Sequence, residues 1–128
     1  YTSFRFSGLT VQPSGGGFNV SFAVRNVGNL AGGEIAQVYL APAPSVPIGV
    51  QQAIRSLAGF DRVVLGPHQT KLVTIHIGPG TQADGHGDPR AFQYWSTLRQ
   101  QWLTSPGRRR VWVGSADSPP ALKLSAIV

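Results

Sequence analysis

Hydrophobic and polar residues alternate along this chain in short stretches, a pattern typical of β-strands with one buried face. The clearest stretch covers residues 18–24, where every second side chain is apolar. The segment 34–41 is more continuously apolar, as expected of a central strand. The strands predicted in this way cover residues 2–10, 18–24, 34–41, 57–65, 71–77, 109–114 and 122–128.

Frequent turn signals separate these strands. The chain has 16 Gly and 10 Pro, which cluster between the predicted strands, as at residues 13–17 and 66–69. The turn at 66–69 leads us to expect a hairpin made of the segments 57–65 and 71–77, with Pro67 at the second turn position. About seven strands with regular turns predict an all-β antiparallel β-sandwich of the immunoglobulin type. A length of 128 residues suits one such domain over residues 1–128.

Two segments do not fit the simple strand pattern. Residues 78–89 are rich in Gly and poor in apolar side chains, so we expect a mobile loop. Between residues 92 and 102, the aromatic and leucine side chains have a spacing compatible with one helical face. The same segment can also form two short strands joined by a turn near residues 96–100. Both alternatives stay open from the sequence.

Candidate catalytic and metal-binding groups are few. Glycoside hydrolysis needs two carboxylates in a fixed arrangement, and the only acidic residues are Glu34, Asp61, Asp84, Asp88 and Asp117. No Gly-x-Ser-x-Gly motif is present for a serine nucleophile, and the chain has no Cys. The alternation Asp84, His86, Asp88 resembles the start of a calcium loop but lacks the terminal Glu, so we interpret it as a solvated linker. We expect no catalytic residue, metal or cofactor within this chain.

Four aromatic residues form the candidate binding site. Tyr94, Trp95, Trp102 and Trp112 provide the amphipathic rings that a sugar-binding platform requires. The same rings suit a sandwich core or a contact between domains, and we favour that interpretation. Separately, Asn19 begins an Asn-Val-Ser glycosylation pattern, but inside a predicted strand.

The net charge of +6 raises the possibility of a nucleic-acid partner. The densest basic cluster, Arg108–Arg110, leads directly into a predicted strand, so we interpret it as a solvated turn or a contact with an acidic neighbouring domain. No apolar run is long enough to cross a membrane. We therefore expect neither a nucleic-acid nor a membrane partner. The chain begins at Tyr1 and has no Met, so we expect a processed or partial polypeptide without a signal peptide.

An ordered series of motifs resembles one known domain. It includes the segment Asn26–Leu40, the Leu-Ala-Gly-Phe-Asp-Arg-Val of Leu57–Val63, and the turn Leu65–Thr70. Later come Phe92–Trp95 and the Val-Trp-Val-Gly-Ser of Val111–Ser115. Together they resemble the fibronectin type III-like domain at the C-terminal end of glycoside hydrolase family 3 enzymes.

The resemblance implies a role without catalysis. In that family the nucleophilic Asp and the acid/base Glu belong to upstream domains, and the C-terminal domain packs against them. The parent enzyme would remove β-linked glucosyl or related residues from non-reducing ends with retention of configuration. The catalytic domains would be the partner, with saccharide as a further possible contact, and no cofactor is implied. Family members are often exported, which favours a secreted or periplasmic location. The alternative is a free-standing carbohydrate-binding or adhesion sandwich that uses exposed Trp residues.

Overall fold

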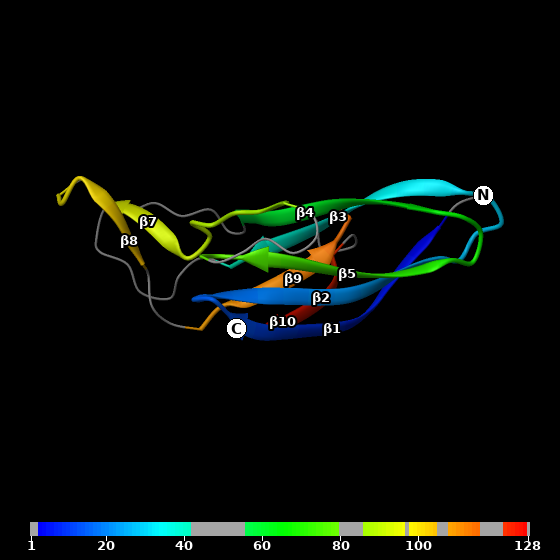
Figure 1. The fold of residues 1–128 in the computed structure, drawn as a ribbon, viewed down its shortest axis with the longest axis horizontal. Coiled ribbons are helices and arrows are strands. Elements are labelled where there is room, and N and C mark those ends of the chain that lie inside the picture. Colours follow the sequence, from blue (N-terminus) through cyan, green and yellow to red (C-terminus); the bar gives the residue numbers. More distant parts are fainter. Residues whose placement is uncertain are drawn as a thin grey trace.

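A computed structural model of the chain describes residues 3–41, 56–79, 86–96, 98–104, 108–115 and 122–127. Within these ranges the regular secondary structure consists of strands alone, arranged in two antiparallel sheets and a separate two-stranded hairpin (Figure 1). The strands are β1 (Phe4–Ser14), β2 (Gly17–Asn26), β3 (Gly32–Leu40), β4 (Ser56–Leu65), β5 (Thr70–Ile77), β6 (His86–Gly87), β7 (Gln93–Ser96), β8 (Gln101–Thr104), β9 (Arg110–Gly114) and β10 (Leu122–Ile127).

The two sheets pack face to face as a β-sandwich. One sheet has the order β1-β2-β5 and the other the order β10-β9-β3-β4-β6. Seven long strands build the two layers, so the predicted all-β sandwich is confirmed. Both inner faces contribute to one core, whose buried members are Phe6, Val20, Phe22, Val24, Ala36, Val38, Leu40, Ala58, Val63, Leu65, Val73, Ile75, Ile77, Val111 and Val113.

The hairpin of β1 and β2 shows how the alternating pattern sets the register. Its two loop residues, Gly15 and Gly16, have φ angles of 59° and 89°, a left-handed geometry that glycine adopts readily and that suits a two-residue hairpin turn. The predicted strand 18–24 is confirmed, with its apolar side chains on the core side. β1 continues to Ser14, past its predicted end at residue 10. Pro13 is tolerated there because β1 lies at the edge of its sheet.

The predicted hairpin of segments 57–65 and 71–77 is wrong. β4 pairs with β3 and β6, whereas β5 pairs with β2 in the opposite sheet. The turn at residues 66–69 forms as expected, with Gln69 N–H donating to the Gly66 carbonyl at 3.2 Å, but it carries the chain from one layer to the other. Both strands have a buried apolar face, so they pack across the core instead of sharing a ladder.

The segment 78–89 is only partly described, and the part that is seen is bound to the sandwich. β6 pairs with Gly59 and Phe60 of β4. Asp88 N–H then donates to the Ala58 carbonyl at 2.7 Å, and Gly78 N–H donates to the Asp88 carbonyl at 2.9 Å. The expectation of a loop throughout is therefore wrong at residues 86–87, because β4 offers an open edge there. Residues 80–85, including Asp84, lie outside the described residues, and the expected mobility remains untested.

The segment 92–102 forms two short strands, β7 and β8, so the second alternative is confirmed over its described residues. Gln100, with a φ of 54°, precedes β8 in the connecting turn. The three Pro residues within residues 41–50 predict a connecting loop, and the run Ser118–Pro120 predicts a break between the last two strands. Residues 42–50 and 116–121 lie outside the described residues. In the described part of the chain, no helix is long and apolar enough to cross a membrane.

Candidate functional site

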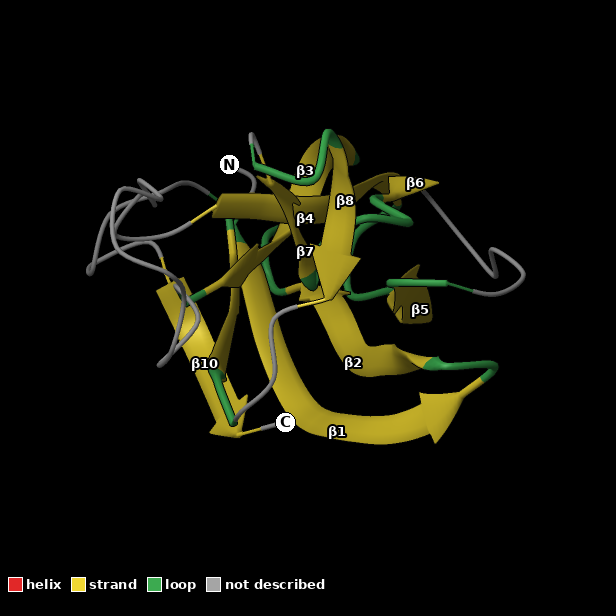
Figure 2. Ribbon diagram, turned by 90° about the vertical axis from the view of Figure 1, so that its left-hand side faces the viewer, coloured by secondary structure: helices red, strands yellow, loops and turns green. Residues whose placement is uncertain are grey.

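The β7–β8 hairpin projects from one end of the sandwich and belongs to neither sheet (Figures 1 and 2). Trp95 and Trp102 are directly opposite each other in its ladder. Their rings meet edge to face, with centroids 5.8 Å apart and an interplanar angle of 73°. Such a pair contributes roughly 0.5–1.5 kcal/mol beyond its buried area. Trp95 is nevertheless 44% exposed and Trp102 42% exposed, and Leu98 in the connecting turn is 91% exposed.

Contacts among Phe18, Phe92 and Arg109 hold the base of the hairpin against the sandwich. The Phe92 ring packs on Phe18 of β2, with centroids 5.4 Å apart. The guanidinium of Arg109 lies 5.1 Å from the centre of the Phe92 ring, where cation–π attraction offsets part of the cost of its burial. Burial lowers the pKa of Arg109 from its ordinary value, because desolvation disfavours the charged form. A Cβ at Gly78 would lie 3.0 Å from Phe92, so glycine permits this close approach.

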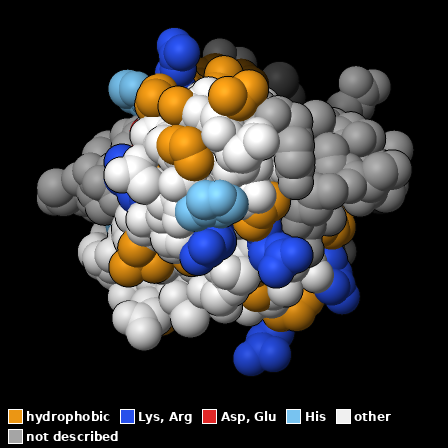
Figure 3. Space-filling view, turned by 90° about the vertical axis from the view of Figure 1, so that its right-hand side faces the viewer, with side chains coloured by type: hydrophobic (Ala, Val, Ile, Leu, Met, Phe, Trp, Pro, Cys, Tyr) orange, Lys and Arg blue, Asp and Glu red, His pale blue; other side chains and the backbone are white. Residues whose placement is uncertain are grey.

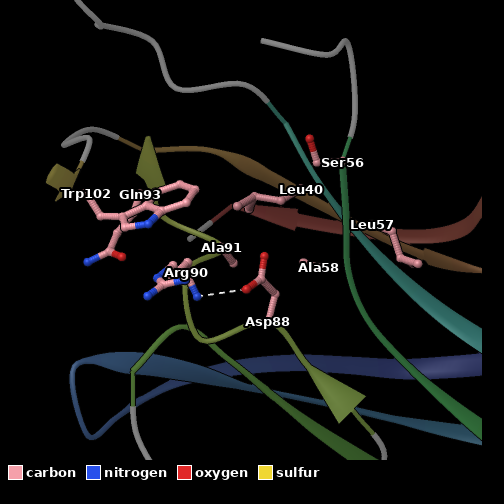
Figure 4. A pocket seen from close by; sticks show the side chains of 9 residues that line it. All are labelled: Leu40, Ser56, Leu57, Ala58, Asp88, Arg90, Ala91, Gln93 and Trp102. Carbon is pink, nitrogen blue, oxygen red and sulfur yellow. Dashed lines mark hydrogen bonds between the residues drawn. The ribbon is translucent and has the colours of Figure 1, made fainter. Parts of the chain in front are cut away.

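A short hydrogen-bonded turn leads from β6 into the hairpin. Asp88 Oδ1 accepts the backbone N–H of Arg90 at 2.9 Å (Figure 4). Ala91 N–H donates to the Asp88 carbonyl at 3.2 Å, and Gln93 N–H donates to the Arg90 carbonyl at 3.0 Å. The turn places the Arg90 guanidinium 4.9 Å from the centre of the Trp102 ring.

A hollow of about 320 Å³ lies between this turn, the hairpin and the ends of β3 and β4. Figure 4 shows Arg90 and Asp88 on one side of it, with Trp102 and Gln93 at the hairpin. The hollow therefore combines an aromatic ring with charged and amide groups. Its lining comprises Leu40, Ser56, Leu57, Ala58, Asp88, Arg90, Ala91, Gln93 and Trp102.

Positive charge gathers around the same end of the sandwich. Arg90, Arg99, Arg108 and Arg110 all have exposed side chains, and Arg110 also donates from Nη1 to Ser125 Oγ at 3.1 Å. Among the described carboxylates, only Asp88 lies at this end. Glu34 and Asp61, the other two, lie further along β3 and β4 in the ladder that these strands form. The opposite end also carries basic and apolar side chains (Figure 3).

The four predicted aromatic residues do not form one platform. Trp95 and Trp102 come together, and Tyr94 pairs with Leu103 in the same ladder. Trp112 lies instead in β9, opposite Tyr39 and Ser125. Its side chain is half-buried on the five-stranded sheet. The sequence predicts a strand around Trp112 but leaves a helix and two short strands open for the segment with the other three aromatic residues. It therefore could not show that two different sheets hold the four rings.

The candidate metal ligands have structural contacts. The His86 ring packs on Phe60 with centroids 4.9 Å apart, and Asp88 holds the turn described above. The described residues contain no group of three or more His, Cys, Asp or Glu side chains that could hold a metal ion. Asp84 and Asp117 lie outside the described residues.

The three-stranded sheet contains a buried polar cluster that the sequence did not predict. His76 is fully buried, with Nδ1 2.7 Å from Asn19 Oδ1 and Nε2 2.6 Å from the Pro79 carbonyl oxygen. Ser21 Oγ lies 2.9 Å from Thr74 Oγ1 on the same two strands. The sequence around His76 does not show whether this side chain is buried. Its hydrogen-bond partner Asn19 is 57 residues away in the chain, so only the fold brings the two together.

This cluster predicts that Asn19 carries no glycan despite its Asn-Val-Ser pattern. β2 is the central strand of its sheet, and the Asn19 amide is engaged with buried His76. We expect the mass of the chain to be unchanged by N-glycosidase after secretion from a eukaryotic host. Ala31→Ser is the control, because it creates an acceptor pattern at the exposed Asn29. A glycan on Asn19 would contradict the position of its side chain against buried His76 in the central strand.

Comparison with known proteins identifies the fold family. The fibronectin type III-like domain family, Fn3-like, matches residues 34–117. The chain belongs to this family. The fibronectin type III-like domain is 32% identical to thermostable beta-glucosidase B of Acetivibrio thermocellus, covering 100% of the chain and 16% of that protein.

Solved structures give the same result. DesR, a beta-glucosidase from Streptomyces venezuelae solved with D-glucose, matches with a TM-score of 0.82 and 36% identity, over 100% of this chain and 15% of that one. The GH3 beta-glucosidase of Bifidobacterium adolescentis matches with a TM-score of 0.80 and 27% identity, over 100% and 17%. The resemblance found in the sequence is therefore confirmed, and this domain corresponds to about one-sixth of these relatives.

Proposed function

We propose that this fibronectin type III-like domain is a non-catalytic accessory module of a β-glucosidase. In this role it packs against the catalytic domains of the parent polypeptide, as its C-terminal part. The parent hydrolyses β-linked glucosyl or related residues at non-reducing ends with retention of configuration. The domain itself supplies buried contact area and fixes the neighbouring geometry.

One observation carries the proposal. The complete chain matches a small part, 15–17%, of each of the β-glucosidases compared above. A free-standing binding protein would be expected to match relatives over most of their length. The exposed Trp pair and the exposed apolar tip of the hairpin add support, since exposed apolar surface of this kind marks contact sites.

A saccharide contact is the second candidate function. The hollow beside Trp102 offers a ring and several hydrogen-bonding groups, which is the chemistry that a sugar requires. We rank it second because Arg90 lies over the Trp102 ring and Trp95 meets its edge. Less of the ring is then open for stacking on a sugar.

The parent protein provides the test. We expect the full polypeptide to hydrolyse an aryl β-glucoside with retention, and we expect removal of this domain to shorten the half-life of that activity at elevated temperature. The isolated domain should show no hydrolysis under the same conditions. A parent without β-glucosidase activity, or a deletion that leaves thermal inactivation unchanged, would overturn the proposal.

A further inference from the structure

We propose that the β7–β8 hairpin is the docking element of this domain, and that it inserts its Trp pair into an acidic surface on the catalytic part of the same polypeptide. The inference rests on the proposed function, which supplies the partner. It adds that the hairpin makes the contact and that the partner surface is acidic.

Among the described residues, the hairpin carries two exposed Trp side chains and the most exposed large apolar side chain, Leu98. Trp95, Leu98 and Trp102 belong to the hairpin that projects from the sandwich (Figure 1), and all three are substantially exposed. A two-stranded hairpin of four residues per strand is marginally stable by itself in water. Buried Trp side chains are among the strongest contributors to protein interfaces. Covering the pair would therefore stabilise both the hairpin and the contact.

The base of the hairpin is already held in place. Phe92 is packed between Phe18 and Arg109, and the Asp88–Arg90 turn is hydrogen-bonded. The Trp pair is also preformed, so little conformational freedom would be lost when a partner covers it. Such preorganisation lowers the free-energy cost of association.

Charge defines the partner surface. Exposed Arg90 lies over the Trp102 ring, and exposed Arg99 lies in the turn of the hairpin. Exposed Arg108 and Arg110 lie just before and at the start of β9, and Asp88 is the only described carboxylate at that end. An acidic surface would complement this set of cations and select the docked orientation. The partner lies in the same polypeptide because the chain corresponds to only 15–17% of the β-glucosidases that it matches. Most of such a protein is therefore available to cover the hairpin.

The test compares variants in the full parent enzyme. We expect Trp95→Ser/Trp102→Ser to increase the rate of limited proteolysis between this domain and the catalytic part by at least about tenfold, because truncating a central Trp weakens protein interfaces by this factor or more. Leu98→Ser, at the turn, should act in the same direction without disturbing the Trp pair. Leu72→Ser is the matched control, since Leu72 is 67% exposed in β5 and should leave the rate unchanged.

Charge-reversal variants and amide hydrogen exchange complete the test. Arg90→Glu/Arg99→Glu should loosen the contact. Arg25→Glu, at the end of β2 that is far from the hairpin, should not.

In the unmodified parent, amide exchange at residues 93–104 should be slower than in the isolated domain, while exchange in β2 stays the same. Equal hairpin exchange in both would overturn the docking proposal. If that parent still hydrolyses β-glucosides, the accessory role stands and only the docking element is wrong. Protection of the isolated hairpin by millimolar cellobiose, or by an oligonucleotide, would also overturn it in favour of those ligands.

Discussion

Phe22→Ala is expected to lower the free energy of unfolding of this domain by about 4 kcal/mol, because removing a buried phenylalanine loses its transfer free energy and leaves a cavity. Phe22 is fully buried in β2, the central strand of its sheet. Its ring meets Phe6 edge to face, with centroids 6.1 Å apart and an interplanar angle of 88°. The loss is a large part of the roughly 5–15 kcal/mol that stabilises a typical domain.

The measurement is urea-induced unfolding followed by circular dichroism, with the midpoint and slope compared between proteins. Leu72→Ala is the control, because this side chain is 67% exposed on the neighbouring strand β5. We expect it to change stability by no more than about 0.5 kcal/mol. If both variants unfold at the same urea concentration, the buried face of β2 has been assigned to the wrong side.

The layers of the fold could be predicted because the alternation along single strands records which face is buried. The segment 18–24 is the best example, since its period of two gives both the strand and its core side. The partner of β5 could not be predicted in this way. A tight turn at 66–69 normally implies a hairpin, and only the need to close both sheets around one core sends β4 and β5 to different layers.

The candidate site was only half predictable for a similar reason. Trp95 and Trp102 are seven positions apart, and their meeting depends on whether the segment is a helix or a hairpin. The sequence predicts a solvated turn or a contact with an acidic neighbouring domain for the basic run that contains Arg109. The structure buries it against Phe92, 17 positions earlier, while Arg108 and Arg110 remain exposed. A contact of this kind depends on the sandwich bringing β9 beside the base of the hairpin.

Asn26→Ala is expected to lower the free energy of unfolding by about 3 kcal/mol, because a buried amide and its partners would lose several hydrogen bonds together. Asn26 is fully buried at the end of β2. Its Nδ2 donates to the carbonyls of Leu30 at 2.7 Å and Leu65 at 3.2 Å, and its Oδ1 accepts Gly28 N–H at 2.9 Å. One side chain therefore ties the β2–β3 loop to the end of β4 in the opposite sheet.

Asn26→Asp separates the role of the amide donor from that of side-chain volume. The aspartate has nearly the same shape and can still accept from Gly28, but it would place an oxygen where Nδ2 faces the carbonyls of Leu30 and Leu65. Burying that charge among acceptors is unfavourable, so at neutral pH we expect Asp to destabilise the domain at least as much as Ala in the same urea titration. Gln12→Ala, at an exposed position of β1, should have little effect. An aspartate variant as stable as the unmodified chain would show that the two donated bonds do not hold the sheets together.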